Sequence, residues 1–440
     1  MRYRPILLFC ALLVPGFPVL TAGQESSPAG GSAAREAREE FPQEIGDECP
    51  QQARDEYTLE TLLRIGREQN PTLASLRARE GAMEAGKRAS SRWANPELAF
   101  EWGTGDPRSG GASRSLSGFS ASQKLENPLT RHFRLQGLQA GVDAAGEEIR
   151  SAALEVSYEI RLHFYRILYL QEVVELARLN EEALAEILGL IETRAEVGEV
   201  RELEAIRLRV EHMRARNEVE ASRIELDQYR QHLNTFLGNV LPGAYSLAGA
   251  MTAEGEEPAL DHLLEGVLPN HPLLVKAARE QEAAAGILRE ARWGWLPDPV
   301  LSGASRKEMD GDVRSFGVGL EIPLWNQSRA AADEGRRRVR QARYEHEALQ
   351  MELEAQLLIH HNHLRLYRQT LRLFEDGLLE EARASMEIAE TSYRQGEISF
   401  LDYLDARRTF HSVQMQRQQA LYDWHVERAA LERAAGGGTL

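Results

Sequence analysis

Cysteine and long apolar stretches are scarce in this sequence of 440 residues. The two cysteines are Cys10 and Cys49. A membrane-spanning helix needs about 20 consecutive apolar residues, and no stretch after residue 22 reaches that length. A protein with several spanning helices is therefore excluded. If the first segment is removed on export, Cys49 remains alone, so an internal disulfide is excluded as well.

Basic and aromatic residues are also few. Lys and Arg number 52 against 68 Asp and Glu, which gives a net charge of −16. Binding to nucleic acid requires an excess of Lys and Arg, so no nucleic-acid partner is expected. Aromatic residues make up 7% of the chain and charged residues 27%. This composition is typical of long helices and coiled coils rather than of a β-rich domain.

The first 22 residues have the pattern of a signal peptide. Arg2 and Arg4 precede the apolar run Ile6–Val14, and the small residue Ala22 follows at the expected cleavage point. The run is short for the alternative, a membrane anchor. Residues 23–55 are rich in Gly, Ser, Glu and Pro, which predicts a flexible N-terminal extension.

The remainder of the chain repeats itself with an offset of about 200 residues. We expect a first repeat over residues 56–240, a linker over 241–258, a second repeat over 259–435 and a short tail over 436–440. In each repeat an Ala-rich and Glu-rich helix ends on an Arg-Trp pair, which contains Trp93 in the first repeat and Trp293 in the second.

A β-hairpin is predicted after each of these helices, within residues 96–125 and 299–323. Apolar and polar residues alternate at both places, as in a strand with one apolar face. We expect that face to meet lipid through Phe100, Trp102, Phe316 and Val318. Weaker strands are predicted at 116–123 and 300–305.

A very long helix follows each hairpin, at about 131–196 and 329–394. Apolar residues from Leu162 to Leu190 recur every 3.5 residues on average, which is the coiled-coil period. Gly198 and Gly396 then interrupt the two helices, and a return helix of about 35 residues is expected after each.

Four strands per chain cannot close a barrel, and unpaired strand edges are not tolerated inside a bilayer. Three copies would supply twelve strands, an even number within the range of outer-membrane barrels. Five tryptophans lie at or beside the hairpins, where interfacial tryptophan is favoured, and they are Trp93, Trp102, Trp293, Trp295 and Trp325. The alternative is a soluble helical rod in which these residues are ordinary core.

Several short motifs are distributed over the two halves of the chain, the first three in the first half and the others in the second. They are Tyr57-Thr58-Leu59-Glu60, Asn70-Pro71, Asn95-Pro96-Glu97-Leu98, His271-Pro272, Leu296-Pro297-Asp298-Pro299, Ile322-Pro323-Leu324-Trp325-Asn326 and the run from Tyr393 to Ala406. Over residues 56–435 the chain resembles the TolC family of outer-membrane efflux ducts, closest to the heavy-metal branch typified by CzcC. The resemblance implies a mainly α fold with membrane β: a trimeric α-helical barrel topped by a 12-strand transmembrane β-barrel, with four strands from each chain.

The resemblance also implies a periplasmic gate. Asp402 and Asp405 are three residues apart and share a helix face; in the family, aspartates at these positions ring the entrance. An ordinary exposed acidic face is the alternative. Glu204 and Arg207 stand at the corresponding places of the first repeat, and Tyr393 matches a family tyrosine that hydrogen-bonds to a neighbouring helix, with Glu204 as its expected partner.

Two further features complete the expected sites. The resemblance implies that Gly198 and Gly396 lie at helix tips that face a second protein of the system, a periplasmic adaptor. His360 and His363 are one helical turn apart and are weak candidates for a metal site, but no carboxylate or cysteine lies near them in the sequence. No catalytic motif is present, so neither enzymatic activity nor a cofactor is expected.

The implied function is a passive duct of a tripartite efflux system in the outer membrane of a Gram-negative bacterium, with a long periplasmic portion. Its expected partners are two further copies of the chain, a periplasmic adaptor, an inner-membrane pump of the resistance-nodulation-division type and outer-membrane lipid. Heavy-metal cations are the expected substrate class. A type I protein-secretion duct and a soluble periplasmic scaffold or adaptor are the alternatives.

Overall fold

The structure is a computed structural model that describes residues 56–105, 110, 113–198, 200–243, 245–253, 255, 258–308, 311–322, 325 and 328–437. The predicted signal peptide and the 23–55 extension lie outside these residues, as do Pro323, Leu324 and Asn326 of one family motif. Within the described residues, no helix combines the length and apolar character needed to cross a membrane.

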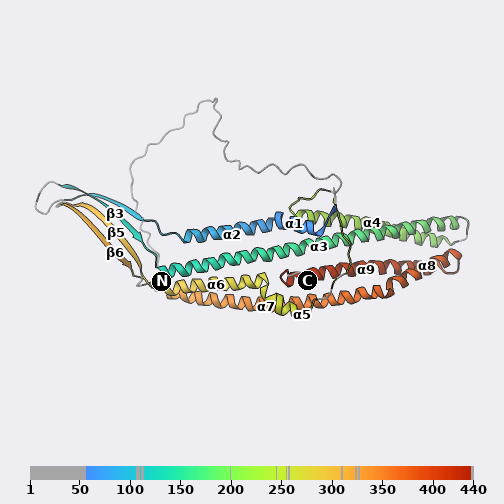
Figure 1. Cartoon of the computed structure of the whole chain (residues 1–440). Coiled ribbons are helices and arrows are strands. Elements are labelled where there is room, and N and C mark those ends of the chain that lie inside the picture. The colour runs from blue at the N-terminus through green and yellow to red at the C-terminus, as the bar shows by residue number, and fades with distance from the viewer. Residues whose placement is uncertain are drawn as a thin grey trace, which may run out of the picture. The chain divides into compact units, whose positions relative to one another are not determined.

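The same order of elements occurs twice, as helix, hairpin, long helix and return helix (Figure 1). The first set is α2 (Pro71–Ser90), β2 (Glu97–Gly105), β3 (Arg114–Lys124), α3 (Pro128–Glu196) and α4 (Glu202–Phe236). The second set is α6 (Pro272–Trp293), β5 (Asp298–Glu308), β6 (Gly311–Glu321), α7 (Arg329–Leu373), α8 (Leu379–Gln395) and α9 (Phe400–Ala434). The predicted strands at 116–123 and 300–305 are confirmed and are longer than expected.

Short elements precede each set. They are β1 (Glu56–Tyr57) and α1 (Leu59–Gln69), then β4 (Ser246–Leu247), α5 (Leu260–His262), a π-helical turn (Leu263–Val267) and a 3-10 turn (Leu268–Asn270). Strand β4 lies within the predicted linker and pairs in parallel with β1. Leu241, Tyr245 and Leu247 are buried, so this part of the linker belongs to the packed structure.

Three long elements begin with the same capping arrangement, in which a polar residue precedes a proline. Asn70 accepts a hydrogen bond from the backbone N–H of Thr72 at 2.9 Å, and Asn127 accepts one from Leu129 at 2.9 Å. At α6 the Nδ1 atom of His271 accepts from the N–H of Leu273 at 3.1 Å. The proline fits the first helical turn because its missing N–H would have no helical partner there.

The long helix predicted at 131–196 is confirmed as α3. The prediction of one continuous helix over 329–394 is wrong at Phe374–Leu378, where a π-helical turn separates α7 from α8. Gly377 has a φ of 120° in this turn, a conformation that glycine adopts far more easily than residues with a Cβ. The helix-favouring residues on both sides conceal this break in the sequence pattern.

The predicted apolar stripe of α3 is only partly the buried face. Tyr169, Val173 and Ile187 are buried as expected. Leu179 is 48% exposed, whereas Ile160 is fully buried although it lies before the predicted stripe. A helix that packs against different neighbours along its length does not keep one face buried throughout, so a single period describes α3 incompletely.

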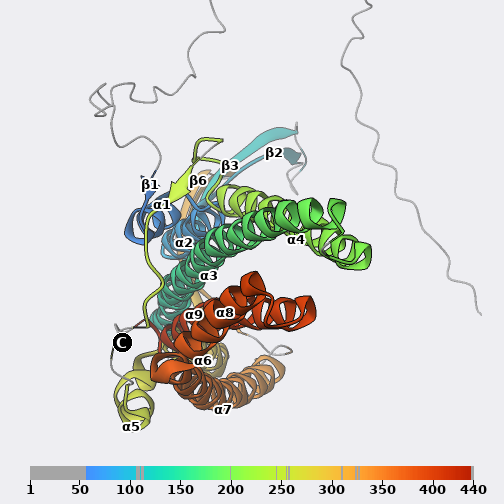
Figure 2. The same cartoon turned by 90° about the vertical axis from the view of Figure 1, so that its right-hand side faces the viewer.

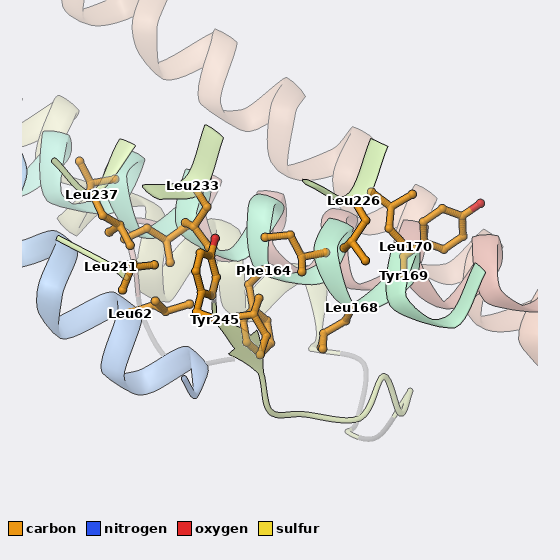
Figure 3. Close-up of a cluster of buried hydrophobic side chains, with 14 of the residues drawn as sticks. Leu62, Phe164, Leu168, Tyr169, Leu170, Leu226, Leu233, Leu237, Leu241 and Tyr245 are labelled. Atoms are coloured by element: carbon orange, nitrogen blue, oxygen red, sulfur yellow. The ribbon is translucent and has the colours of Figure 1, made fainter. Parts of the chain in front are cut away.

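Helix α3 contacts α2, α4, α6 and α9 and therefore connects the two sets of elements (Figures 1 and 2). Buried side chains form three clusters along the helices. The first joins α1, α3, α4 and the β4 segment, with Leu62, Phe164 and Leu233 among its members (Figure 3). The second lies mainly between α7 and α9, and the third lies where α3, α4, α8 and α9 meet.

Helices α3 and α6 pass very close to each other at two glycines. A Cβ placed on Gly286 would lie 2.5 Å from the Cα of Gly137, which is closer than real side chains allow. The contact is between two backbones, so no flexible side chain can move away to make room. Glycine at both positions is therefore a packing requirement of this crossing.

We predict that Gly286→Ala lowers the free energy of unfolding by about 1–3 kcal/mol, because the added methyl group forces the two helices apart. The matched control is Gly189→Ala in α3, where nothing lies within 4 Å of the added Cβ. Removing glycine from an open helical position should be neutral or stabilising by up to about 1 kcal/mol. Thermal unfolding followed by circular dichroism measures both, and equal midpoints for the two variants would contradict the packing argument.

Candidate functional site

The two hairpins form a single antiparallel sheet with strand order β2-β3-β5-β6. Pairing between β3 and β5, with Phe119 opposite Ser305, joins the hairpin of one repeat to that of the other. Strands β2 and β6 are the edges, so each has one side with no strand partner in the described chain.

Residues that pair across strands point to the same face of a sheet, so the register defines two faces of different chemistry. One face is apolar and exposed: Phe100 is 67% exposed, Trp102 85%, Phe316 94% and Val318 74%. All four predicted lipid-facing residues therefore lie on one face. Leu98, Phe119, Leu301 and Leu320 share it.

The opposite face carries small and charged residues. Glu101 of β2 forms an ion pair with Arg306 of β5 at 3.4 Å, across the intervening strand β3. Lys124 of β3 forms one with Glu321 of β6, across β5. Ser120, Ser302 and Gly317 lie between these charged residues. A sheet with one face suited to lipid and one suited to water is the pattern of a strand set that separates the two media.

Three tryptophans with exposed rings lie where the helices meet the sheet. Trp93 is 51% exposed, Trp295 55% and Trp325 91%. Trp293 is 37% exposed at the end of α6. The guanidinium carbon of Arg131 lies 4.4 Å from the ring centre of Trp93, which is a cation–π contact.

At the ends away from the sheet, each long helix is followed by a turn that contains a glycine. Gly198 follows α3 with a φ of 77°, and Gly396 follows α8 with a φ of 79°. Both are in the left-handed region, where glycine ends a helix without strain. The two helix pairs α3–α4 and α8–α9 end side by side here (Figure 2).

Tyr393 lies inside the hydrophobic cluster at this end and is 7% exposed. Its ring stacks on that of Tyr403, with centres 5.1 Å apart, and contacts Phe400 at 6.0 Å. Burial raises the pKa of Tyr393, and the carboxylate of Glu204 raises it further. Glu204 is therefore near Tyr393, but in the described chain the expected hydrogen bond between them is not formed.

Asp402 and Asp405 have different surroundings, although both are exposed. The carboxylate of Asp402 accepts hydrogen bonds from the N–H and the hydroxyl of Ser399, at 3.3 and 2.8 Å, and Ser399 accepts one from the N–H of Asp402 in return. This is a capping box that starts α9. Asp405 takes no part in the cap, so its carboxylate remains available for other contacts.

Arg207 is exposed and forms no ion pair with Asp402 or Asp405 within the described chain. The charged contacts that do tie these helices together were not foreseen from the sequence. Arg394 of α8 forms an ion pair with Glu186 of α3 at 3.3 Å, and Arg209 of α4 forms one with Glu192 of α3 at 2.7 Å.

Arg407 makes the densest set of polar contacts near this end. Its guanidinium donates to the side-chain and main-chain oxygens of Asn180 and to the hydroxyl of Tyr403, each at 3.2 Å. It therefore links α9 to α3 next to the Tyr393–Tyr403 stack. Residues 180 and 407 belong to different repeats, so no local pattern in the sequence could have paired them.

His360 and His363 are brought together by a carboxylate that the sequence reasoning missed. Glu427 of α9 lies 2.8 Å from Nδ1 of His360 and 3.3 Å from Nδ1 of His363. Burial raises the pKa of Glu427, but the contacts with the two imidazoles outweigh this and leave it below its usual value. Within the described residues, no group of three or more ligating side chains is arranged to hold a metal ion.

The fold is that of a known family. The chain belongs to the outer membrane efflux protein family, whose model matches residues 62–239 and 263–437. The expected resemblance is thereby confirmed.

Individual relatives have low identity but match over most of their length. The cobalt-zinc-cadmium resistance protein CzcC of Cupriavidus metallidurans is 23% identical over 389 residues, which are 88% of this chain and 92% of that protein. The outer membrane efflux protein BepC of Brucella suis is 22% identical over 72% of this chain and 71% of that protein.

Solved structures of outer-membrane proteins share the fold. The Vibrio cholerae protein VceC matches with a TM-score of 0.74 and 16% identity, over 86% of this chain and 96% of that one. The open state of the Neisseria gonorrhoeae channel MtrE matches with a TM-score of 0.72 and 17% identity, over 86% and 89%.

We predict that Asp402→Ala weakens the start of α9 by about 0.5–1 kcal/mol, because it removes half of the capping box. Asp405→Ala, three residues further along the same exposed face, should change stability by less than about 0.5 kcal/mol. Hydrogen–deuterium exchange at the amides of residues 399–405 measures the local opening. Equal exchange in the two variants would show that the cap does not hold this turn.

Proposed function

We propose that this protein is the outer-membrane duct of a tripartite efflux system and conducts substrate passively from the periplasm to the outside. The two-faced sheet at one end of the long helices carries the proposal. An apolar face with side chains up to 94% exposed is unfavourable in water and suited to lipid. Membership of the outer membrane efflux protein family supports the same conclusion and argues against a soluble scaffold.

The working unit in this proposal is a homotrimer with a 12-strand barrel. The free edges of β2 and β6 support it, because strand edges inside a bilayer need partners. A second observation comes from α4, where Leu203, Ile206, Val210 and Met213 are 39–56% exposed. Their spacing of three and four residues is that of a coiled-coil seam. A neighbouring copy would cover this seam and continue the helical wall.

The helix ends at Gly198 and Gly396 are the proposed contact with a periplasmic adaptor, which connects the duct to an inner-membrane pump of the resistance-nodulation-division type. In the proposed trimer Asp402 and Asp405 would gather around a narrow entrance, with Glu204, Arg207 and Tyr393 on the facing helices. Gathered carboxylates attract cations. The duct itself would catalyse nothing and hold no cofactor.

Heavy-metal cations are the proposed substrate class. The support is the similarity to CzcC, which is named for resistance to cobalt, zinc and cadmium, together with the exposed carboxylates of the proposed entrance. His360 and His363 are not included as metal ligands, because Glu427 already engages both rings.

The membrane placement is tested by charge substitutions on the sheet. The substitution Phe316→Arg, on the apolar face, should lower the yield of heat-resistant trimer. An arginine at mid-depth on the lipid side costs about 2–4 kcal/mol in each chain. The matched control is Ser315→Arg, one residue away on the opposite face. Trimer is measured by semi-native gel electrophoresis of outer-membrane fractions. Equal yields for the two variants, or monomer alone on crosslinking the unaltered protein, would count against the proposal.

The gate is tested by single-channel recording in planar bilayers. Asp405→Asn should reduce cation selectivity, and Asp402→Asn/Asp405→Asn should reduce it further, because the narrow entrance loses negative charge that salt screens poorly. Arg207→Ala and Tyr393→Phe should instead increase the open probability, since both residues are proposed to form contacts with a neighbouring copy that hold the helices closed. Asp261→Asn in α5 serves as the charge-matched control. Unchanged selectivity in the double variant would place the entrance elsewhere.

A further inference from the structure

Four helix ends meet at the base of the sheet and form a strongly basic surface. We define this basic collar as residues 84–92, 126–134, 287–293 and 329–343, at the sheet ends of α2, α3, α6 and α7 (Figure 1). It contains thirteen Lys and Arg against five Asp and Glu, a net charge of +8. The whole chain has a net charge of −16, so the collar is an exception to its composition.

Contacts between the four ends show that the collar is one surface. Arg131 of α3 donates to the carbonyl of Ser91 beyond α2, and Arg134 lies 3.8 Å from Glu290 of α6. Gly335 of α7 packs against Leu288 of α6. The positive charges therefore act together, rather than being spread over separate parts of the chain.

Helix stability explains some of this charge but not all of it. Lys87, Arg88 and Arg292 lie in the last turns of α2 and α6, where the helix dipole favours a cation. Helix α7 is different, since Arg329 is its first residue and its first turn has no acidic side chain. Cations at a helix N-terminus oppose the dipole, so α7 carries this charge at some cost to its own stability.

The arginines near the start of α7 also outnumber the carboxylates that are close enough to pair with them. Arg336 and Arg337 share the single carboxylate of Asp333, and their side chains are 50% and 74% exposed. Arg340 is exposed and forms no ion pair within the described residues. Symmetric assembly would not neutralise this excess, because each added copy brings the same +8 to the same level.

The exposed tryptophans adjoin the collar and indicate what it faces. Trp293 falls within the collar, Trp93 directly follows its first range, and Arg131 of the collar lies over the ring of Trp93. Tryptophan marks the boundary between lipid tails and headgroups, so arginines on the helical side of it lie at headgroup depth. Seven residues separate Arg329 from Arg336, a rise of about 10 Å along the helix, and the long arginine side chains cover that depth.

We propose that the basic collar binds the phosphate groups of anionic phospholipids on the periplasmic surface of the outer membrane. Guanidinium groups suit this ligand because they bind phosphate oxygens in pairs, and clusters of basic residues beside a membrane segment attract anionic lipid. The binding fixes how deep the sheet sits and opposes its displacement along the membrane normal. This inference rests on the membrane placement proposed above.

The test compares lipids that quench tryptophan fluorescence. The full-length protein, in a Trp102→Phe background, is reconstituted in phosphatidylcholine that contains either brominated phosphatidylglycerol or brominated phosphatidylcholine. The remaining exposed tryptophans all lie beside the collar, and Trp424 is buried. Preferential quenching by phosphatidylglycerol, which weakens as salt is added, is the expected result.

The variant Arg336→Gln/Arg337→Gln/Arg340→Gln should reduce the preference for phosphatidylglycerol about tenfold. The control Arg214→Gln/Arg223→Gln/Arg383→Gln removes the same charge from exposed positions on α4 and α8 and should keep the preference. An unchanged preference in the collar variant, or equal quenching by both lipids in the unaltered protein, overturns the inference.

Two further outcomes separate this inference from its premises. If brominated phosphatidylcholine quenches the unaltered protein, the tryptophans meet lipid and the membrane placement stands, whatever the result for phosphatidylglycerol. If neither lipid quenches, the placement fails and the inference fails with it. If the collar variant lowers the thermal stability of the assembly in pure phosphatidylcholine while the lipid preference is unchanged, the arginines act between copies, and lipid binding is rejected.

Discussion

The pairing of β3 with β5 is the interaction on which the architecture depends. Without it the two hairpins would be separate, and an isolated two-stranded hairpin is marginally stable at best. With it, four strands share one register and their apolar residues line up on a single face. The same register directs the charged residues to the other face, where Glu101 meets Arg306. One set of hydrogen bonds thus joins the two repeats and gives the sheet one apolar and one polar face.

At the other end of the helices, near Gly198 and Gly396, buried side chains provide the stability and the charged contacts lie on the surface. The interior is aromatic, with Tyr393 and Tyr403 stacked and almost completely buried. Ion pairs on the outside, such as Arg394 with Glu186, join α8 to α3 while remaining solvated. Exposed pairs of this kind contribute only about 0–1 kcal/mol each. The helices are therefore held by packing, and their polar contacts can exchange partners at small cost.

Much of the fold could be predicted from the sequence because its signals are local. The X-Pro pairs that start α2 and α6, the alternation in β2 and β6 and the two turn glycines all lie within a few residues of the structures they specify. The π-helical turn at Gly377 was missed because good helix formers surround it. Leu179 was assigned to the wrong face because α3 packs against several different helices along its length.

The candidate sites were harder to predict than the fold, for a physical reason. Asp402 and Asp405 appear equivalent in sequence, yet only Asp402 is engaged by the cap at Ser399. The contacts of Arg407 with Asn180 and of Glu427 with His360 join residues far apart in the chain. Such pairs depend on the axial register of packed helices, which a periodic pattern does not specify. The register was set by packing features such as the Gly137–Gly286 contact.

The duplication of the chain has a consequence for how such a duct can diversify. Two identical repeats in three copies would give six equivalent positions around the axis, and any substitution would appear six times. Because the repeats are joined in one chain and have already diverged, a substitution would appear three times in the proposed trimer and would alternate with a different residue. Glu204 and Arg207 in one repeat stand where Asp402 and Asp405 stand in the other. Unlike residues can thus face one another around a ring, as acid beside base, which strict sixfold symmetry would forbid.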